Sequence, residues 1–193
     1  MDLTADKGNA GLRRPIESLL AAGRTTRFAG VVFRLAHPKF AGPEEVATGE
    51  GARLHGARWN APLSFAAVYA SATARDCVEE ALAWCARYNL PQSAGTPAVL
   101  VALECHLVTV LDLTDAATRR RIGLSRAAIV DDRWWLEQSE GRESSCQAVG
   151  RAAFAAGVEA IKVPSVRVAR AWNLVIFPRN LHPGSFIKMI RRA

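Results

Sequence analysis

The order of predicted helices and strands is the feature that most constrains the fold of this chain. Strands are expected over residues 29–36, 68–71, 97–107, 108–113, 160–163, 174–177 and 186–190. Helices are expected over residues 15–22, 74–88 and 144–156, with a short basic helix after Thr114 as its N-cap. The intervening residues 1–12, 37–56 and 122–143 are expected to be a loose tail, a long loop and an irregular region. Because the strands and helices do not alternate as regular βαβ units, the pattern predicts a single α+β domain.

The composition is that of a globular protein. With 193 residues, half of them apolar, the chain can bury a core without disulfides or a metal. No apolar run approaches the roughly 20 residues that span a bilayer. The N-terminal residues also lack the basic and apolar regions of a signal peptide. We therefore expect no membrane segment and a cytoplasmic location.

The cysteines and histidines give no sign of a disulfide framework or a metal centre. The four cysteines contain no Cys-x-x-Cys pair, and Cys77 and Cys85 lie about two turns apart on one predicted helix. Reduced, buried thiols are expected. The four histidines lack metal-ligand spacing, so no metal site is predicted.

The net charge of +7 comes from 25 basic residues, 21 of which are arginines. Such a charge is compatible with nucleic acid, a phosphorylated small molecule or an acidic protein as partner. Arginine suits phosphate because its planar guanidinium donates two hydrogen bonds at once. The charges are dispersed along the chain, however, so charge alone does not select among these partners.

Arg34 interrupts the apolar strand over residues 29–36. A charged side chain in such a strand must be paired or face a ligand, because burying a lone charge is costly. The alternative is an arginine in water on an edge strand. The strand pattern by itself leaves both readings open.

Glu80 lies on the helix predicted over residues 74–88. The apolar residues at helical spacing, which we expect to be buried, are Val78, Ala81, Leu82 and Cys85. Glu80 falls off this stripe and can therefore face a cleft.

A polar cluster is predicted around the segment Gly56-Ala57-Arg58-Trp59-Asn60, which precedes Tyr69-Ala70-Ser71. Glycine allows a ligand to approach the backbone, and arginine, asparagine and serine can bind phosphate or ribose. A hairpin followed by an ordinary helix cap is the structural alternative. Further along, Pro164-Ser165 is a turn that precedes Asn173-Leu174 and Pro178.

Taken in order, these pieces resemble the RES family. The pieces are an arginine in the first strand, Gly-Ala-Arg-Trp-Asn, Tyr-x-Ser, a helical glutamate, Pro-Ser and Asn-Leu followed by a proline. Gln147 and Gly150 also fit the family's helix before the Pro-Ser turn. The resemblance covers about residues 30–180, with two departures. The family commonly has a second glycine where Ala57 stands, and Glu79 neighbours Glu80, which is selected by its spacing of eleven residues from Tyr69.

The resemblance implies a RES domain over residues 29–193, preceded by an N-terminal extension with a short helix over residues 1–28. RES domains resemble the catalytic core of diphtheria-toxin-like ADP-ribosyltransferases. They are toxins of bacterial toxin–antitoxin pairs that degrade NAD. The implied reaction cleaves the nicotinamide–ribose bond with water or inorganic phosphate as acceptor; the alternative is mono-ADP-ribosylation of a protein at the same site.

The resemblance also assigns residues. Arg34, Tyr69, Glu80 and Ser165 would be the catalytic residues: Arg34 near the scissile bond or the phosphates, Tyr69 stacked on nicotinamide, Glu80 as the acidic group, and Ser165 on nicotinamide or ribose.

Three further residues, Arg58, Asn60 and Ser71, would bind NAD, with Arg58 on the pyrophosphate. The partner implied is an Xre-type antitoxin that blocks the site. No direct nucleic-acid role is expected, and a homodimer stays an open alternative.

Overall fold

The computed structural model describes residues 7–87, 91 and 98–192. Its six strands form one sheet in the order β1-β2-β5-β4-β3-β6, and β1 also pairs with β3. The first five strands of this order therefore close into a barrel, and β6 extends it beside β3. The strands are β1 (Thr26–Ala36), β2 (Val68–Ser71), β3 (Val99–Asp112), β4 (Ala160–Pro164), β5 (Trp172–Ile176) and β6 (Phe186–Arg192). The predicted α+β class is confirmed.

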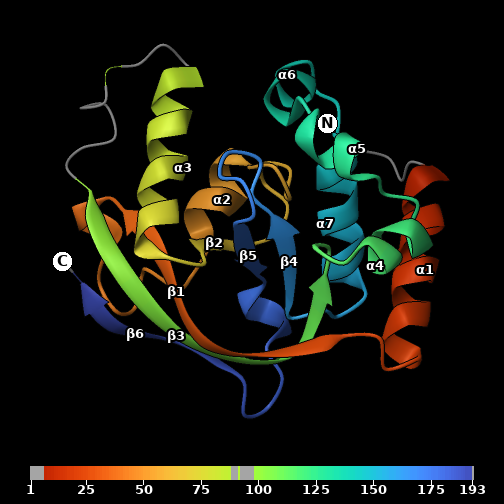
Figure 1. Ribbon diagram of the computed structural model, residues 1–193, viewed down its shortest axis with the longest axis horizontal. Helices are drawn as coiled ribbons and strands as arrows, with labels where there is room; N and C mark the ends of the chain where they lie inside the picture. The colour runs from red at the N-terminus through yellow and green to blue at the C-terminus, as the bar shows by residue number, and fades with distance from the viewer. Residues whose placement is uncertain (1–6, 88–90, 92–97, 193) are drawn as a thin grey trace.

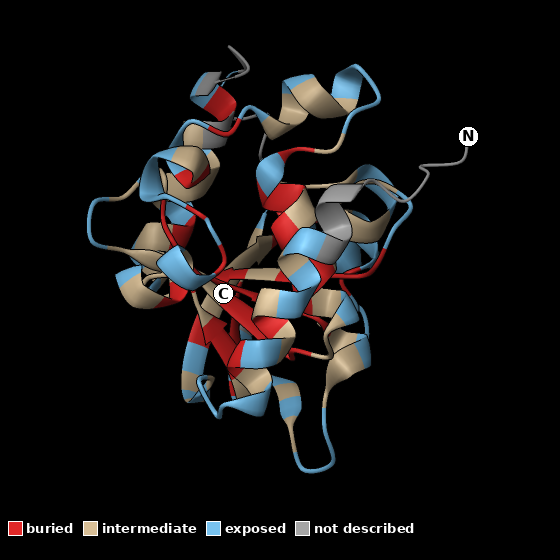
Figure 2. Ribbon diagram, turned by 90° about the vertical axis from the view of Figure 1, so that its right-hand side faces the viewer, coloured by how far each residue is buried: buried red, intermediate tan, exposed pale blue. Residues whose placement is uncertain are grey.

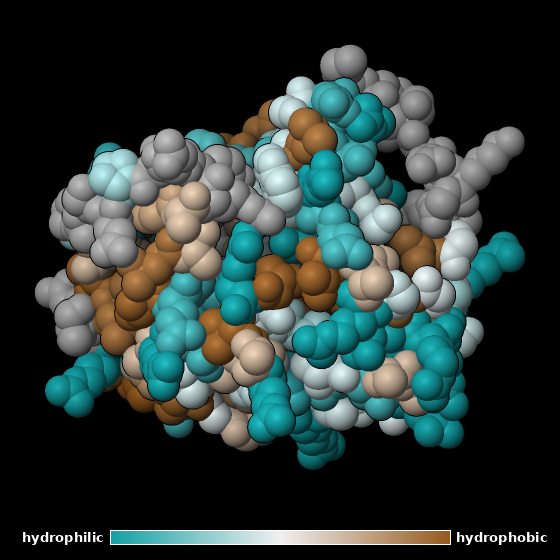
Figure 3. Space-filling view, turned by 45° about the horizontal axis from the view of Figure 1, so that its top comes forward, coloured by the Kyte–Doolittle hydropathy of each residue, from teal (hydrophilic) through white to brown (hydrophobic). Residues whose placement is uncertain are grey.

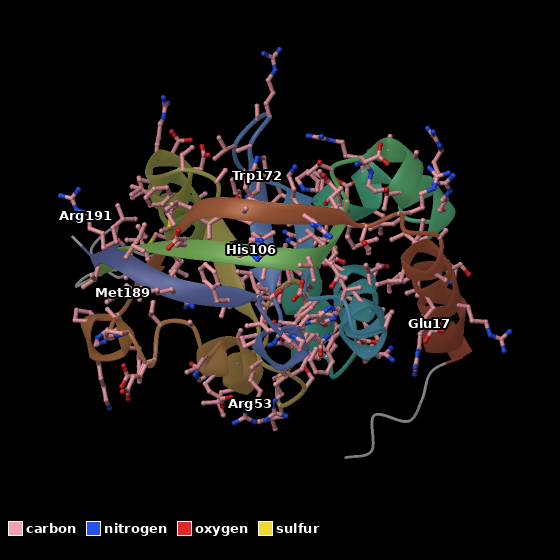
Figure 4. The ribbon with its side chains drawn as sticks, turned by 90° about the horizontal axis from the view of Figure 1, so that it is seen from below. Glu17, Arg53, His106, Trp172, Met189 and Arg191 are labelled. Carbon is pink, nitrogen blue, oxygen red and sulfur yellow. The ribbon has the colours of Figure 1, made fainter. Side chains whose placement is uncertain are left out.

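The helices lie around this barrel (Figure 1). They are α1 (Lys7–Ala21), α2 (Glu50–His55), α3 (Ala74–Arg87), α4 (Ala116–Arg121), α5 (Arg126–Val130), α6 (Trp134–Ser139) and α7 (Ser145–Ala155), with 3-10 turns η1 (Pro38–Phe40) and η3 (Pro178–Asn180). Helices α3 and α6 project at the same end of the molecule, whereas α1 packs against α7. Seen from below, β1, β3 and β6 run side by side across the opposite end (Figure 4).

Two apolar clusters form the core, and Figure 2 shows the buried residues gathered on the central strands and the inner sides of the helices. One cluster joins strands of the barrel, including Val32, Leu103 and Leu174. The other joins the barrel to α1 and α7 through residues such as Ile16 and Val149. Burial of this apolar surface is the main force that holds the helices on the barrel.

Helix α1 begins earlier than expected. Residues 7–12 were predicted to belong to a loose tail and Pro15 to begin the helix, but the helix already starts at Lys7 and Pro15 lies inside it. Proline lacks the N–H of the helical hydrogen bond, and its interior position costs about 3 kcal/mol. Ile16 and Leu19 are both buried against α7, and this packing offsets the cost. Residues 1–6 of the expected tail lie outside the described residues.

Strand β3 is continuous where two strands were predicted. The expected break between Leu107 and Val108 coincides with a bulge, since the two-residue step from Thr26 to Phe28 on β1 faces the three-residue step from Leu107 to Val110 on β3. The carboxylate of Glu159, which is fully buried, accepts the backbone N–H of Val108 at 2.5 Å and a second N–H beside it. The bulge changes the alternation of side chains without ending the strand. The expected start at residue 97 lies outside the described residues.

Short helices account for the other differences. The expected loop over residues 37–56 contains η1 and α2, and the expected irregular region over residues 122–143 contains α5 and α6. Helices of five or six residues are too short for apolar periodicity to reveal them. Asp115, rather than Thr114, caps α4. The predicted helix over residues 144–156 is confirmed: Ser144 and Gln147 form its capping box.

Helix α3 is rotated relative to the predicted stripe. Val78 and Leu82, which were expected to be buried, are each 41% exposed, whereas Cys77 and Cys85 are buried. The prediction is confirmed for Cys85 and wrong for Val78 and Leu82, because small thiols rather than these larger residues fit against the barrel. Its predicted end at residue 88 lies outside the described residues. The orientation puts Glu80 at the boundary between the buried face and the pocket described below.

The four cysteines are free and buried, as predicted. Burial raises the pKa of Cys77 to about 11 and that of Cys105 to about 12, so both remain neutral thiols at physiological pH. Among the described residues, no cluster of histidine, cysteine and acidic side chains has the grouping of a metal site. The described helices also include none with the length and apolarity needed to cross a membrane.

Candidate active site

A pocket of about 230 Å³ opens at the end of the barrel where α3 and α6 project. On this face, apolar side chains are exposed among hydrophilic ones (Figure 3). The pocket is lined by residues from six segments of the chain, namely Ala57, Arg58, Trp59, Tyr69, Glu80, Trp134, Val163, Pro164, Val166, Arg167, Asn173 and Val175. Glu80 is the acidic residue among these described lining residues, and Arg58 and Arg167 are the basic ones.

Glu80 is held by two side chains from the opposite wall. Its Oε1 accepts a hydrogen bond from Ser165 Oγ at 2.6 Å and another from Asn173 Nδ2 at 2.9 Å. Both donors come from sequence positions more than 80 residues away, so the barrel closure brings them to α3. Both bonds end on Oε1. They therefore fix the orientation of the carboxylate, and neither of them uses Oε2.

Ser165 is fixed at the turn that follows β4. Its Oγ accepts the backbone N–H of Arg167 at 3.1 Å and of Val168 at 2.8 Å. With these acceptor positions used, the hydroxyl hydrogen is free to donate to Glu80. The serine is 4% exposed and does not line the pocket, so it contacts the Glu80 carboxylate from the protein interior.

Tyr69 presents its ring to the pocket and keeps its hydroxyl inside the protein. The hydroxyl donates to Asn60 Oδ1 at 2.7 Å and accepts the backbone N–H of Trp59 at 3.0 Å. Burial raises the pKa of Tyr69 well above its ordinary value, which keeps the phenol neutral. The ring surface, rather than the hydroxyl, is therefore what Tyr69 offers a ligand.

The segment Gly56–Asn60 is clamped against α7. Ala57 and Asn60 exchange backbone hydrogen bonds, and Gln147 Nε2 donates to the carbonyls of Ala57 at 3.1 Å and Asn60 at 3.4 Å. At Gly150, any Cβ would overlap with the backbone of Trp59. Gly56 has a φ of 71°, which favours glycine. Close backbone contact between this segment and α7 explains why glycine occurs at position 150.

Arg58 reaches from this clamped segment to the C-terminal end of α5. Its Nη1 donates to the carbonyl of Ile129 at 2.7 Å and to that of Asp132 at 3.3 Å. The guanidinium lines the pocket in a fixed position, with further N–H groups for an anionic ligand.

Arg34 does not line the pocket. Its Nη1 donates to the carbonyl of Val46 at 2.7 Å, while its buried Nε has no hydrogen-bond partner among the described residues. Burial lowers the pKa of Arg34. The reading of an arginine on an edge strand is wrong, because β1 pairs with both β2 and β3.

The comparison with protein-family models is decisive for the family. The model of the RES domain matches residues 31–188. The chain belongs to the RES family.

Two known proteins are similar to this RES domain along most of its length. NAD(+) phosphorylase MbcT of Mycobacterium tuberculosis and its counterpart in Mycobacterium bovis are 34% identical over 147 residues, which cover 71% of this chain and 69% of the relative. A chain in the crystal structure of the M. tuberculosis MbcT–MbcA toxin–antitoxin complex superposes with a TM-score of 0.68 at 25% identity. The match covers 97% of the RES chain and 92% of the other.

The RES-domain structure brings together some of the predicted site residues and separates others. Arg58, Tyr69 and Glu80 line one pocket, and Ser165 touches Glu80. Asn60 is fully buried and lies behind Tyr69, with its Nδ2 donating to the carbonyl of Ala52 at 2.7 Å. The remaining two, Arg34 and Ser71, lie on β1 and β2 outside the pocket lining.

Three further lining residues, Asn173, Trp134 and Arg167, offer side chains that can bind a ligand but were not predicted as site residues. Asn173 belonged to the matched Asn-Leu motif, and its place opposite the helical glutamate could have been suspected from that motif. Trp134 and Arg167 carry no comparable signal, because α6 was expected to be irregular and Arg167 lies in a loop whose path only the fold defines.

Proposed function

We propose that this RES-family chain cleaves the nicotinamide–ribose bond of NAD with inorganic phosphate as the acceptor. The single observation that carries the proposal is the carboxylate of Glu80, held by Ser165 and Asn173 in a pocket that also presents the ring of Tyr69. The similarity to NAD(+) phosphorylase MbcT supports the same reaction. The outcome would be a toxin that depletes NAD.

The chemistry requires stabilisation of positive charge. As the bond from ribose C1″ to the nicotinamide nitrogen breaks, its electron pair leaves with the nitrogen and nicotinamide departs as a neutral molecule. The ribose acquires oxocarbenium character, which a nearby carboxylate stabilises. An oxygen of phosphate then bonds to C1″ and gives ADP-ribose-1″-phosphate; water in its place gives ADP-ribose.

Glu80 is suited to this role by its position. Hydrogen bonds from Ser165 and Asn173 fix the orientation of its carboxylate. We propose that Oε2 faces the ribose and its 2″-hydroxyl. Ser165 is then a positioning residue that acts through Glu80, and the ring of Tyr69 stacks on nicotinamide.

We assign roles to the four other predicted site residues from the contacts that each of them makes. We propose that Arg58 binds the pyrophosphate and that Arg34 contacts NAD after releasing the carbonyl of Val46. Asn60 positions the hydroxyl of Tyr69, to which it is bonded at 2.7 Å. Ser71 lies opposite Asn173 in the register of β2 and β5, and we propose that it supports that residue.

Arg167 is our candidate for the phosphate that accepts the ribose. It lines the pocket, is exposed, and follows Ser165 by two residues, so its guanidinium can reach an anion beside Glu80. The Arg167→Ala variant should raise the KM for phosphate while leaving the KM for NAD nearly unchanged. Arg170→Ala, in the same loop but outside the pocket lining, is the matched control; equal effects of both variants would contradict the role of Arg167.

The test of the proposed function is nicotinamide release from NAD with and without phosphate. Glu80→Ala should abolish release, whereas Glu79→Ala should not, because Glu79 pairs on the surface with Arg75 at 2.7 Å. ADP-ribose-1″-phosphate is the expected product, and free ADP-ribose would indicate hydrolysis. Label transferred from NAD to a protein band of a lysate would instead support ADP-ribosylation. Full activity in the Glu80 variant would refute the site.

The barrel and its family support three further proposals. We propose that residues 29–193 form the RES domain, that residues 1–28 are an extension packed on it through α1, and that the core is related to diphtheria-toxin-like ADP-ribosyltransferases. The packing of α1 on α7 and the mixed α+β architecture are compatible with these assignments.

An antitoxin is the proposed partner. The similarity to a chain of the MbcT–MbcA toxin–antitoxin complex supports such a partner, and we propose that it is of the Xre type and closes the pocket entrance in the cytoplasm. A homodimer of the toxin is a further proposal. Light scattering of the isolated chain and of the complex would measure both stoichiometries.

A further inference from the structure

The pocket has a second aromatic residue, Trp134, which the proposed chemistry does not use. It is the first residue of α6 and is half-buried in the pocket wall. Its ring meets that of Trp135 edge-on, with centroids 6.4 Å apart and planes at 88°. An aromatic surface in a pocket wall is suited to stacking with a flat ring of a ligand.

The order of residues along the pocket can be followed from their contacts, starting at Glu80. Glu80 is bonded to Asn173, and Asn173 and Val175 lie two residues apart on β5 and therefore on one side of the strand. Tyr69 is opposite Val175 in the register of β2 and β5. The ring of Tyr69 thus follows directly after the carboxylate.

Arg58 and Trp134 continue the same order. The hydroxyl of Tyr69 is bonded to the N–H of Trp59, the neighbour of Arg58, and the guanidinium of Arg58 reaches the carbonyl of Asp132. Trp134 follows Asp132 by two residues. The sequence of groups is therefore carboxylate, aromatic ring, arginine and second aromatic ring.

NAD carries complementary groups: the nicotinamide and its ribose for the neighbouring pair Tyr69 and Glu80, then the pyrophosphate for Arg58, and then the adenosine for Trp134. We infer that Trp134 binds the adenine ring and thereby makes the enzyme selective for dinucleotides over mononucleotides. The inference rests on the proposed function, because it takes the scissile ribose to lie at Glu80. It adds a specificity residue from a helix that has no part in the bond cleavage.

The surroundings of α6 favour this role. Gln138, one turn after Trp134, donates to the carbonyl of His55 at 3.0 Å and accepts from Gln147 at 3.0 Å. Helix α6 is therefore tied to the end of α2 and to Gln147, which also holds the segment that carries Arg58. A ring held in place before the ligand arrives loses little conformational entropy on binding.

The test compares NAD with nicotinamide mononucleotide, which has the same scissile bond but lacks the adenosine half. Trp134→Ala should lower kcat/KM for NAD about 10-fold or more, as expected for a lost base–aromatic stack. It should leave kcat/KM for the mononucleotide within about twofold, and Trp134→Phe should retain most of the activity on NAD. Leu136→Ala is the matched control, since Leu136 is 41% exposed on α6 and does not line the pocket.

An equal loss on both substrates, whether from misfolding or from a contact with nicotinamide, would overturn the inference. So would a wild-type enzyme that does not prefer NAD. Calorimetry with AMP provides a readout without catalysis: wild type should bind AMP, and Trp134→Ala should bind it about 10-fold more weakly. If neither substrate releases nicotinamide, the proposed function fails, and the dependence of AMP binding on Trp134 then decides the inference alone.

Discussion

The contact between α7 and the segment Gly56–Asn60 predicts a large effect of Gly150→Ala. A Cβ at Gly150 would overlap with the carbonyl oxygen of Trp59 and lie 2.8 Å from its carbonyl carbon. Since ordinary contacts between heavy atoms are about 3.5 Å, the backbone of Trp59 would have to retreat by more than about 1 Å. The obstacle is backbone, so no rotamer change relieves it, and the side chain of Trp59 is itself 2% exposed.

We expect Gly150→Ala to lower the free energy of unfolding by about 3 kcal/mol, the upper part of the range for overpacked cores. For a chain of this size that corresponds to a fall in Tm of about 6–12 °C. Activity should also fall at temperatures where the variant is folded, because the displaced segment carries Arg58. Calorimetric unfolding and nicotinamide release measure the two effects.

Gly11→Ala is the matched control for this substitution. Gly11 also lies inside a helix, but a Cβ built on it meets nothing within 4 Å. There the same exchange should stabilise the protein by about 0.5–1 kcal/mol, because alanine has the higher helix propensity. If Gly150→Ala were as stable as wild type, the close approach of Trp59 would not be a constraint and the reasoning would be refuted.

Three further variants test the supports of the site and of the barrel. Tyr69→Phe removes the bonds to Asn60 and Trp59 but keeps the ring, so we expect a stability loss of about 1–3 kcal/mol with KM for NAD nearly unchanged, measured by denaturation and kinetics. Gln147→Leu should cost a similar 1–3 kcal/mol or so and lower kcat/KM by loosening the segment that holds Arg58. Burial opposes the charge of Glu159, but hydrogen bonds outweigh it and the pKa of Glu159 is lowered. The stability that ionised Glu159 contributes is therefore present above its unfolded-state pKa and is lost as pH falls through its lower folded-state pKa. The Glu159→Gln variant lacks this ionisation, so its Tm should fall less than that of wild type over the same acidic range. Melting curves recorded at several pH values measure the difference.

The sequence was sufficient to predict residues whose place in a helix or strand follows from the spacing of their near neighbours. The strand containing Arg34, the capped helix beginning at Ser145 and the glutamate on α3 all follow from spacing within a few turns or pleats. The order of motifs then identified the family, which the match to residues 31–188 confirms. Local pattern and motif order were sufficient for the class of fold and for the centre of the pocket.

The remainder depends on long-range packing, which a local pattern does not contain. The rotation of α3 is determined by which side chains fit against the barrel, and Val78 and Leu82 are exposed as a result. Glu159 is buried because a bulge in β3, some 50 residues earlier, presents two N–H groups to it. Trp134 lines the pocket on α6, a helix that Gln138 ties to α2 and α7 by hydrogen bonds to residues 83 and 9 positions away.

Closure of the barrel has a consequence for when this protein can become active during its synthesis. The pocket needs Arg58 and Tyr69 from the first half of the chain and Asn173 and Val175 from near its end. A nascent chain that has not yet emerged as far as β5 lacks both the partner strand of β2 and a donor to Glu80. Pairings between such distant segments also form slowly. The proposed toxin would therefore be harmless on the ribosome, and its inhibitor would need to be present only from the moment the last strands pair.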